Sequence, residues 1–216
     1  LNITNIESLR FYSQWADVAV LARELNLDQV SGISRMIREQ DIRGPHGELI
    51  RIEMFVHGAL CMATSGKCYL SLHETGMSAN RGKCRQTCRK AYIVTERETG
   101  YELAIDYEYI MSPKDLCTIG FADRLIDAGV SVFKIEGRAR SPEYVKTVTS
   151  CYDEAVKAVA DGSYNEDKIA GWRERLASVF NRGFWDGELR AFADRHTPAT
   201  DPDRIPRFWH GVRGAV

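Results

Sequence analysis

The stretch LIRIEMFVHGALC, residues 49–61, joins a regular pattern to an irregular one. Its even positions from 50 to 56 are apolar, and they alternate with Arg51 and Glu53, which is the period of a half-buried β-strand. The alternation stops at His57, where a segment rich in glycine and cysteine begins. The stretch therefore predicts a strand over 49–56 that leads directly into a long irregular loop.

Strands and helices alternate on either side of this segment. Apolar runs at 18–21, 109–111 and 130–135 predict three further strands, each followed by a segment with helical periodicity. The helices are expected to begin near Asp28, at Ser112-Pro113 and at Ser141-Pro142, with a last helix over 169–180. Such β-then-α repeats favour a parallel sheet with right-handed crossovers.

The two later helices carry specific expectations about burial. The helix that begins at Ser141 should bury one stripe, formed by Val145, Val148, Tyr152, Val156 and Val159. Cys117 and Cys151 fall on the apolar sides of the second and third expected helices, so we interpret both as structural.

A doubly wound sheet and a (β/α)8 barrel both satisfy this alternation. A full barrel takes about 250 residues, whereas this chain has 216 residues and about four recognisable βα units. We therefore expect an α/β fold: a partial (β/α)8, TIM-like barrel with a cysteine-rich loop inserted over 57–90. A short hairpin is expected after the loop, with strands at 91–94 and 102–105.

Composition excludes several classes of protein. Hydrophobic residues make up 44% of the chain and charged residues 27%, which is typical of a globular protein and not of a disordered one. No apolar run approaches the roughly 20 residues that cross a bilayer, so no membrane partner is expected. The net charge of −1 gives no whole-surface attraction for nucleic acid. No secretory signal is recognisable, which favours a reducing, cytoplasmic location for the six cysteines.

Four of the six cysteines lie within the irregular loop. They are Cys61, Cys68, Cys84 and Cys88, in the pattern CMATSGKC, fifteen residues, CRQTC. Thiolates are preferred ligands of zinc and of iron–sulfur clusters, and spacings of six and three intervening residues differ from a zinc ribbon and favour iron–sulfur. The alternative is a set of reduced cysteines that merely pack.

A run of cations interleaves with the last two of these cysteines. It consists of Arg81, Lys83, Arg85, Arg89 and Lys90, with no acidic residue between them and with Tyr92 close behind. Such a run can contact RNA phosphates, with an aromatic ring for base stacking. It can equally be a solvated face of the loop or compensate the charge of an anionic cluster.

Several blocks of the sequence resemble the U32 peptidase family. They are EMFVHGALC (53–61), SGKCYLS (65–71), ANRGKC (79–84), SPKDLC (112–117), FKIEGR (133–138), SPEYV (141–145) and NRGF (181–184). They follow the family's order, and the first is highly specific. The unbroken CRQTC pair and the SPKDL block are most similar to a branch that hydroxylates tRNA.

The resemblance implies a function in hydroxylation or in proteolysis. Members are historically labelled peptidases or collagenases, while better understood ones make 5-hydroxyuridine in tRNA with prephenate, hydroxylate a ribosomal cytidine, or act on ubiquinone precursors. Several carry a [4Fe–4S] cluster. By motif position Cys61, Cys68, Cys84 and Cys88 are the implied ligands, with Cys117 as a substitute for Cys88.

The resemblance also implies an incomplete barrel. Family members have an additional N-terminal segment that supplies the first barrel strands, and no counterpart is recognisable here. Residues 1–187 are thus expected to form the C-terminal part of a TIM-like barrel, with a partner chain as one way to complete it. Residues 188–216 carry three of the six prolines and many charges, and we expect this tail to be poorly ordered.

Barrel enzymes carry their reactive groups where the strands end. Glu53 and His57 close the second strand, and Glu136 and Arg138 follow a later one, so these four are the candidate catalytic residues. Arg23, after the first strand, and Arg140 are candidates for holding an anionic co-substrate such as prephenate. A structural salt-bridge network at the barrel mouth would explain the same charges.

The sequence thus favours an iron–sulfur enzyme that hydroxylates a wobble uridine, with tRNA as partner. A U32-type peptidase is the alternative, although neither an HExxH site nor a GxSxG elbow is present. A non-catalytic, RNA-binding half-barrel is a third hypothesis.

Overall fold

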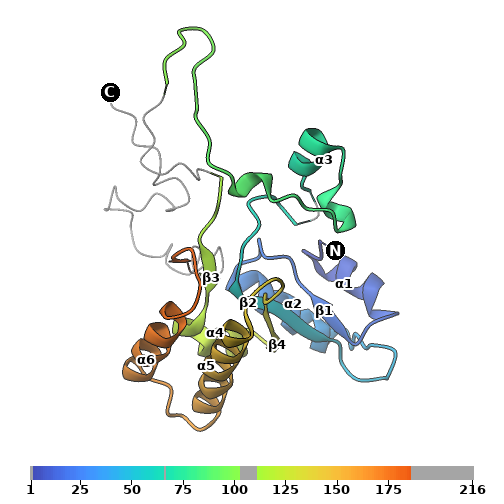
Figure 1. Cartoon of the computed structure of the whole chain (residues 1–216). Coiled ribbons are helices and arrows are strands. Elements are labelled where there is room, and N and C mark those ends of the chain that lie inside the picture. Colours follow the sequence, from blue (N-terminus) through green and yellow to red (C-terminus); the bar gives the residue numbers. More distant parts are fainter. Residues whose placement is uncertain (1, 66, 103–110, 186–216) are drawn as a thin grey trace, which may run out of the picture. The chain divides into compact units, whose positions relative to one another are not determined.

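The computed structural model describes residues 2–65, 67–102 and 111–185 (Figure 1). These residues divide into two compact units. The sheet unit comprises the described residues up to Leu60 and from Lys114 onward, and the cysteine unit comprises those from Cys61 to Pro113. The expected tail at 188–216 and most of the expected strand at 109–111 lie outside the described residues.

The sheet unit contains one sheet of five strands. In chain order they are β1 (Val18–Val20), β2 (Arg51–Gly58), β3 (Asp115–Cys117), β4 (Val130–Ile135) and β5 (Phe184–Trp185). Strands β1 and β4 pair with β2 in parallel, whereas β3 is antiparallel to the end of β2 and pairs in parallel with β5. The strands expected around 18–21, 49–56 and 130–135 are confirmed.

The expected α/β class is confirmed, whereas the expected partial barrel is found as an open, mixed sheet, with no closed barrel among the described residues. The departure from a barrel lies at β3, which follows the cysteine unit. The chain leaves β2 at Gly58, and β3 starts beside the end of β2 and runs antiparallel to it, with Cα pairs His57–Cys117 and Gly58–Leu116.

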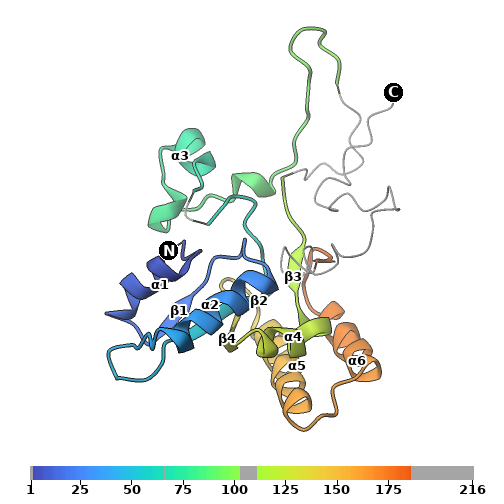
Figure 2. The ribbon, with the colours of Figure 1, turned by 180° about the vertical axis from the view of Figure 1, so that it is seen from behind.

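Helices cover the sheet and build the core with it. They are α1 (Ile6–Ser13), α2 (Leu27–Glu39), α4 (Ala122–Asp127), α5 (Pro142–Ala160) and α6 (Glu166–Ala177), with a 3-10 turn at Ile119–Phe121. Helix α2 runs along the sheet beside β1 and β2, as the view from behind shows (Figure 2). Its apolar face packs in one core with the buried side chains of β2. None of the described helices combines the length and apolar character that crossing a membrane requires.

Helix starts follow the capping signals, with two corrections. Ser141 caps α5 as expected, whereas α2 is capped by Asn26, whose side chain and that of Gln29 form a capping box, and not by Asp28. The helix expected from Ser112 is wrong: β3 occupies its first part, and α4 begins only at Ala122. Cys117 is therefore buried in a strand, while Cys151 is buried in α5 as expected.

The buried stripe of α5 is displaced from the expected one. Val145 and Val156 are 42% and 40% exposed, whereas Cys151 and Ala155 are fully buried. Small side chains let α5 approach its neighbours closely, and the two tyrosines, Tyr144 and Tyr152, fill the core beside the sheet. Periodicity identified the helix but not which of two adjacent stripes faces inward.

The cysteine unit has little regular structure. It contains α3 (Leu70–Thr75) and two 3-10 helices, Ala79–Arg81 and Thr87–Arg89. Gly76 and Gly82 end the first two of these in the left-handed conformation. Beyond them, Thr95 and Glu102 form a bridge around a tight turn, close to the expected hairpin, although its second strand falls mostly outside the described residues.

Candidate functional site

Two neighbouring strands place an ion pair on the sheet. Lys134 of β4 donates to Glu53 of β2 with an Nζ–Oε1 distance of 2.6 Å, and its ammonium lies 5.4 Å from the centre of the Phe55 ring. The side chain of Glu53 is 16% exposed, so the pair offsets the cost of placing a carboxylate within an apolar strand. The sequence analysis named Glu53 as a catalytic candidate and did not single out Lys134 as its partner.

His57 lies deeper, at the end of β2. Only 1% of the residue is exposed, and the rings of Tyr144, Tyr152 and Phe184 surround it. Burial, assisted by the positive charge of Arg140, lowers the pKa of His57 to about 4. The imidazole is therefore neutral near neutral pH.

Tyr152 connects His57 to the ends of β2 and β3. Its hydroxyl donates to the carbonyl of Val56 at 2.8 Å, accepts from the amide of Thr118 at 3.0 Å, and lies 3.5 Å from Nδ1 of His57. Burial raises the pKa of Tyr152 far above its usual value, so the hydroxyl keeps its proton and this network stays neutral. The tyrosine thus acts as a neutral support for the histidine.

Gly58 allows the ends of β2 and β4 to meet. Its φ is +110°, and a Cβ atom there would lie 2.6 Å from the carbonyl oxygen of Glu136. The amide of Glu136 in turn donates to the carbonyl of His57 at 2.9 Å. Both the positive φ and the close carbonyl oxygen require a glycine here, and this glycine lets the backbones of His57 and Glu136 meet.

The other charged candidates are separated. Oε1 of Glu136 accepts from the backbone amide of Arg138 at 2.9 Å, while the side chain of Arg138 is exposed. Arg23 is half-buried in the segment after β1. Arg140 alone among the candidate arginines turns inward, with a side chain only 9% exposed.

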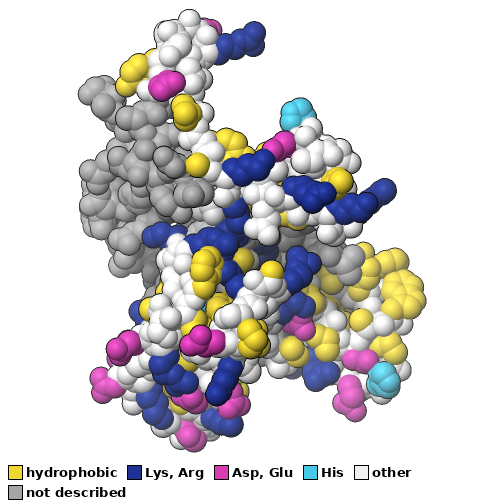
Figure 3. Space-filling model, in the orientation of Figure 1, with side chains coloured by type: hydrophobic (Ala, Val, Ile, Leu, Met, Phe, Trp, Pro, Cys, Tyr) yellow, Lys and Arg dark blue, Asp and Glu magenta, His cyan; other side chains and the backbone are white. Residues whose placement is uncertain are grey.

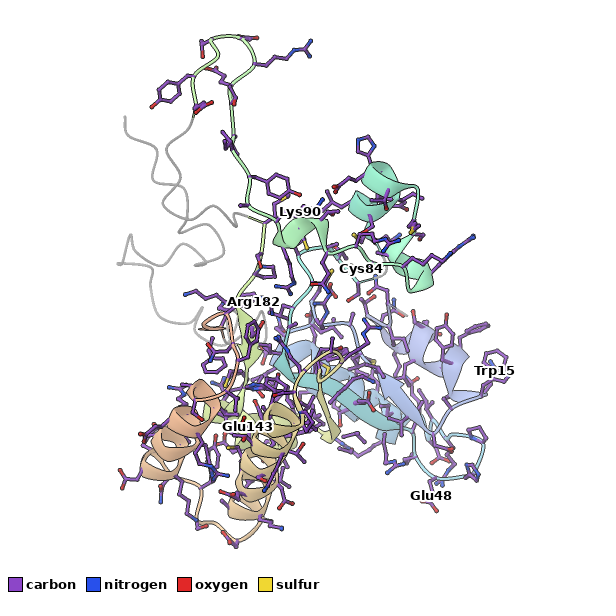
Figure 4. The ribbon with its side chains drawn as sticks, in the orientation of Figure 1. Trp15, Glu48, Cys84, Lys90, Glu143 and Arg182 are labelled. Atoms are coloured by element: carbon purple, nitrogen blue, oxygen red, sulfur yellow. The ribbon has the colours of Figure 1, made fainter. Side chains whose placement is uncertain are left out.

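A buried carboxylate that the sequence analysis missed holds Arg140. Asp115 of β3, 1% exposed, receives Nη2 of Arg140 at 3.1 Å and Nη1 of Arg182 at 3.2 Å, one on each carboxylate oxygen. Arg182 lies beside β3 on the segment that follows α6 (Figure 4). Asp115 and Arg182 belong to the SPKDLC and NRGF blocks, and an aspartate directly before the apolar pair Leu116-Cys117 was the available signal.

All four loop cysteines are in the cysteine unit, with Cys84 labelled in Figure 4. Burial raises the pKa of the Cys88 thiol, Arg89 opposes this, and the thiols of Cys61, Cys84 and Cys68 raise it further. The backbone amide of Gln86 donates to the sulfur of Cys84 at 3.4 Å. The four thiols are thus near enough to influence one another electrostatically.

Thiolate donors are the chemistry that an iron–sulfur cluster requires. Within the described part of the chain, however, no three His, Cys, Asp or Glu side chains are gathered closely enough to hold a metal ion. The four cysteines are therefore ligands of the right type and lie in one unit. The described structure does not bring them together as a metal site.

Cations gather on the visible face of the cysteine unit around α3 (Figure 3). Lys90 pairs with Glu74, Arg89 donates to Ser112 at 3.0 Å, and Arg85 contacts the sulfur of Met77. Three of the five cations thus have partners within the unit, while Arg81 and Lys83 are exposed. Intramolecular contacts explain more of this run than the sequence suggested.

Comparison with known proteins identifies the family. A model described as peptidase family U32 matches residues 1–197. The chain belongs to the U32 family. A collagenase of Porphyromonas gingivalis is 63% identical to this U32 chain over 187 residues, which is 87% of the chain and 45% of that protein. No solved structure matches.

More distant relatives carry other names. The 23S rRNA 5-hydroxycytidine C2501 synthase of Escherichia coli is 40% identical over 74% of the U32 chain and 23% of its own length. The tRNA hydroxylation protein P1 of Bacillus subtilis is 33% identical over 84% of the chain and 42% of its own length. The expected closest likeness to the tRNA branch is therefore corrected, because the collagenases are more similar. The chain spans about half or less of each of these relatives.

Proposed function

We propose that this U32 chain belongs to an enzyme of the collagenase type that hydrolyses peptide bonds. The observation that carries the proposal is the 63% identity with a protein named collagenase. Both the specific EMFVHGALC block and the charged cluster of the sheet unit fall within the residues matched by the family model.

The strand-end residues supply groups that peptide hydrolysis can use. In this proposal Glu136 activates the attacking water as general base. His57 is only 1% exposed, so its neutral imidazole stays within the core, while its backbone carbonyl accepts from the amide of Glu136 at 2.9 Å and helps to hold that residue in place. The buried guanidinium of Arg140 places a fixed positive charge near these groups, which favours an anionic part of the substrate.

Hydrolysis of denatured collagen by the purified full chain tests the proposal. The parent should release peptides, and Glu136→Gln should reduce the rate at least about a hundredfold, the range lost with a general base. Glu143→Gln, on the exposed first turn of α5, is the matched control and should retain the parent rate. Absence of peptide release by the parent, or equal rates for parent and Glu136→Gln, would reject the proposed role.

RNA hydroxylation is the second candidate, and the cysteine unit favours it. Cys61, Cys68, Cys84 and Cys88 would hold a [4Fe–4S] cluster, which would supply redox or structural chemistry. A tRNA or ribosomal RNA would be the substrate, with prephenate as the hydroxyl donor, and Arg81 and Lys83 would contact phosphates. The 40% identity with the ribosomal cytidine hydroxylase supports this candidate. Hydroxylated nucleosides in RNA incubated with the chain, without peptide release, would favour it over proteolysis.

A further inference from the structure

Three segments of the sheet unit meet at the carboxylate of Asp115. Asp115 comes from β3, Arg140 from the loop between β4 and α5, and Arg182 from the segment between α6 and β5. Asp115 is 1% exposed and the side chain of Arg140 is 9% exposed, while that of Arg182 is 24% exposed. In this cluster Asp115 and Arg140 are therefore buried, and Arg182 is the more accessible residue.

Asp115 uses only part of the donor capacity of both guanidiniums. A guanidinium has five N–H groups and commonly grips a carboxylate through two of them. Here Arg140 and Arg182 each donate to Asp115 through a single nitrogen, on different carboxylate oxygens. The carboxylate thus ties two guanidiniums together, and each keeps N–H groups that Asp115 does not engage.

Aromatic rings fix the planes of these guanidiniums. The Arg140 guanidinium lies 4.5 Å from the centre of the Phe180 ring and 5.2 Å from that of Tyr144, and the Arg182 guanidinium lies 5.1 Å from Phe180. Stacking occupies the flat faces and leaves the N–H groups, which lie in the plane, for hydrogen bonding. Phe180 itself is 59% exposed, so it offers an apolar surface next to the two guanidiniums.

The charges do not balance among the described residues of the cluster. Two guanidiniums face one carboxylate, and the nearby Glu136 carboxylate is engaged by the amide of Arg138. Surplus positive charge among largely buried groups is unfavourable unless an anion completes it. A carboxylate is the planar, two-oxygen anion that two guanidinium edges match best.

We propose that Arg140 and Arg182 bind the C-terminal carboxylate of a peptide, that Phe180 contacts its last side chain, and that Asp115 positions the two guanidiniums. This inference rests on the proposed peptidase function and deepens it, since it restricts the substrate to peptides with a free, apolar C-terminal residue. Because the side chain of Arg140 is only 9% exposed, it is better suited to a small terminal group than to the phosphates of a folded RNA.

Binding of a fluorescein-labelled pentapeptide that ends in leucine tests this site without requiring cleavage. The free acid and the C-terminal amide differ by one charge and have nearly the same shape. With the full chain, fluorescence anisotropy should show the acid binding at least about tenfold more tightly than the amide. In Arg182→Gln this preference should disappear.

Arg175→Gln provides the matched control, because it removes an arginine from another ion pair, 2.7 Å from Glu154, and should keep the preference. Equal binding of acid and amide by the parent, or a preference that survives in Arg182→Gln, would overturn the proposal. Binding of an oligoribonucleotide with the same dependence on Arg182, and no binding of the acid peptide, would also overturn it. Tight binding of the acid without cleavage would support the site while rejecting the peptidase function.

Discussion

The imidazole of His57 lies among three aromatic rings, beside the buried guanidinium of Arg140. At this position a protonated ring would lose its hydration, and none of the three surrounding rings is an acidic partner. The residue is therefore suited to hydrogen bonding as a neutral group, and its titration is linked to folding.

Stability should fall in mild acid because of His57. Its pKa is about 4 in the folded chain and 6.5 for a histidine free in water, so the unfolded state binds more protons between these pH values. The contribution is complete above pH 6.5 and is lost as the pH falls toward 4, by up to about 3 kcal/mol. Urea unfolding at pH 7 and pH 4.5 should show a smaller loss for His57→Gln than for the parent. Equal losses would mean that other groups cause the acid sensitivity.

At the scale of elements, the sheet is organised around β2. It pairs with β1 and β4 along its length and with β3 at its end, and its even-numbered side chains from 52 to 56 are buried. The close approach of β4 at this end depends on Gly58, where the backbone of Glu136 occupies the space that a side chain would need. The arrangement of His57 and Glu136 thus depends on one residue without a side chain.

Replacing Gly58 should destabilise the sheet unit. Gly58→Ala places a Cβ 2.6 Å from a carbonyl oxygen at a φ of +110°, so we expect a loss of at least about 2 kcal/mol in the free energy of unfolding. Gly32→Ala, in helix α2 with no atom within 4 Å of the new Cβ, should stabilise the chain by about 0.5–1 kcal/mol. Urea unfolding of both variants measures the difference. Equal stabilities would show that β4 can move away from β2.

At the scale of the whole molecule, the chain leaves the sheet unit after Leu60 and re-enters it at Lys114. The segment between them contributes four cysteines and little regular structure, so a bound cofactor would add greatly to its stability. Cys88 belongs to the same unit as the other three, whereas Cys117 is buried in β3 of the sheet unit, which favours Cys88 as the fourth ligand in the proposed cluster.

Anaerobically purified chain should contain about four iron and four sulfide ions. Cys84→Ser should lose most of both, because it removes one ligand, while Cys151→Ala, in helix α5, should retain them. Elemental analysis together with a sulfide assay measures both ions. Zinc in place of iron would instead indicate a structural site, and full iron retention in Cys84→Ser would exclude this residue as a ligand.

Some features of this protein were already determined by the sequence. The alternation in 49–56 predicted β2, Ser141-Pro142 predicted the start of α5, and the cysteine spacing marked a segment that departs from regular structure. Family membership also followed from local blocks. These are short-range properties, because periodicity, capping and motif spacing are set by neighbouring residues.

Only the tertiary structure decided which distant residues meet. Contacts between segments far apart in the chain determine the antiparallel direction of β3 and the buried face of α5. They also determine the Glu53–Lys134 ion pair and the pairing of Arg140 and Arg182 with Asp115. Asp115 and Arg182 are 67 positions apart, and no local pattern in the sequence predicts their pairing. The burial of these side chains and the pairing of their charges result from how the strands and helices pack together. A single sequence does not show that packing.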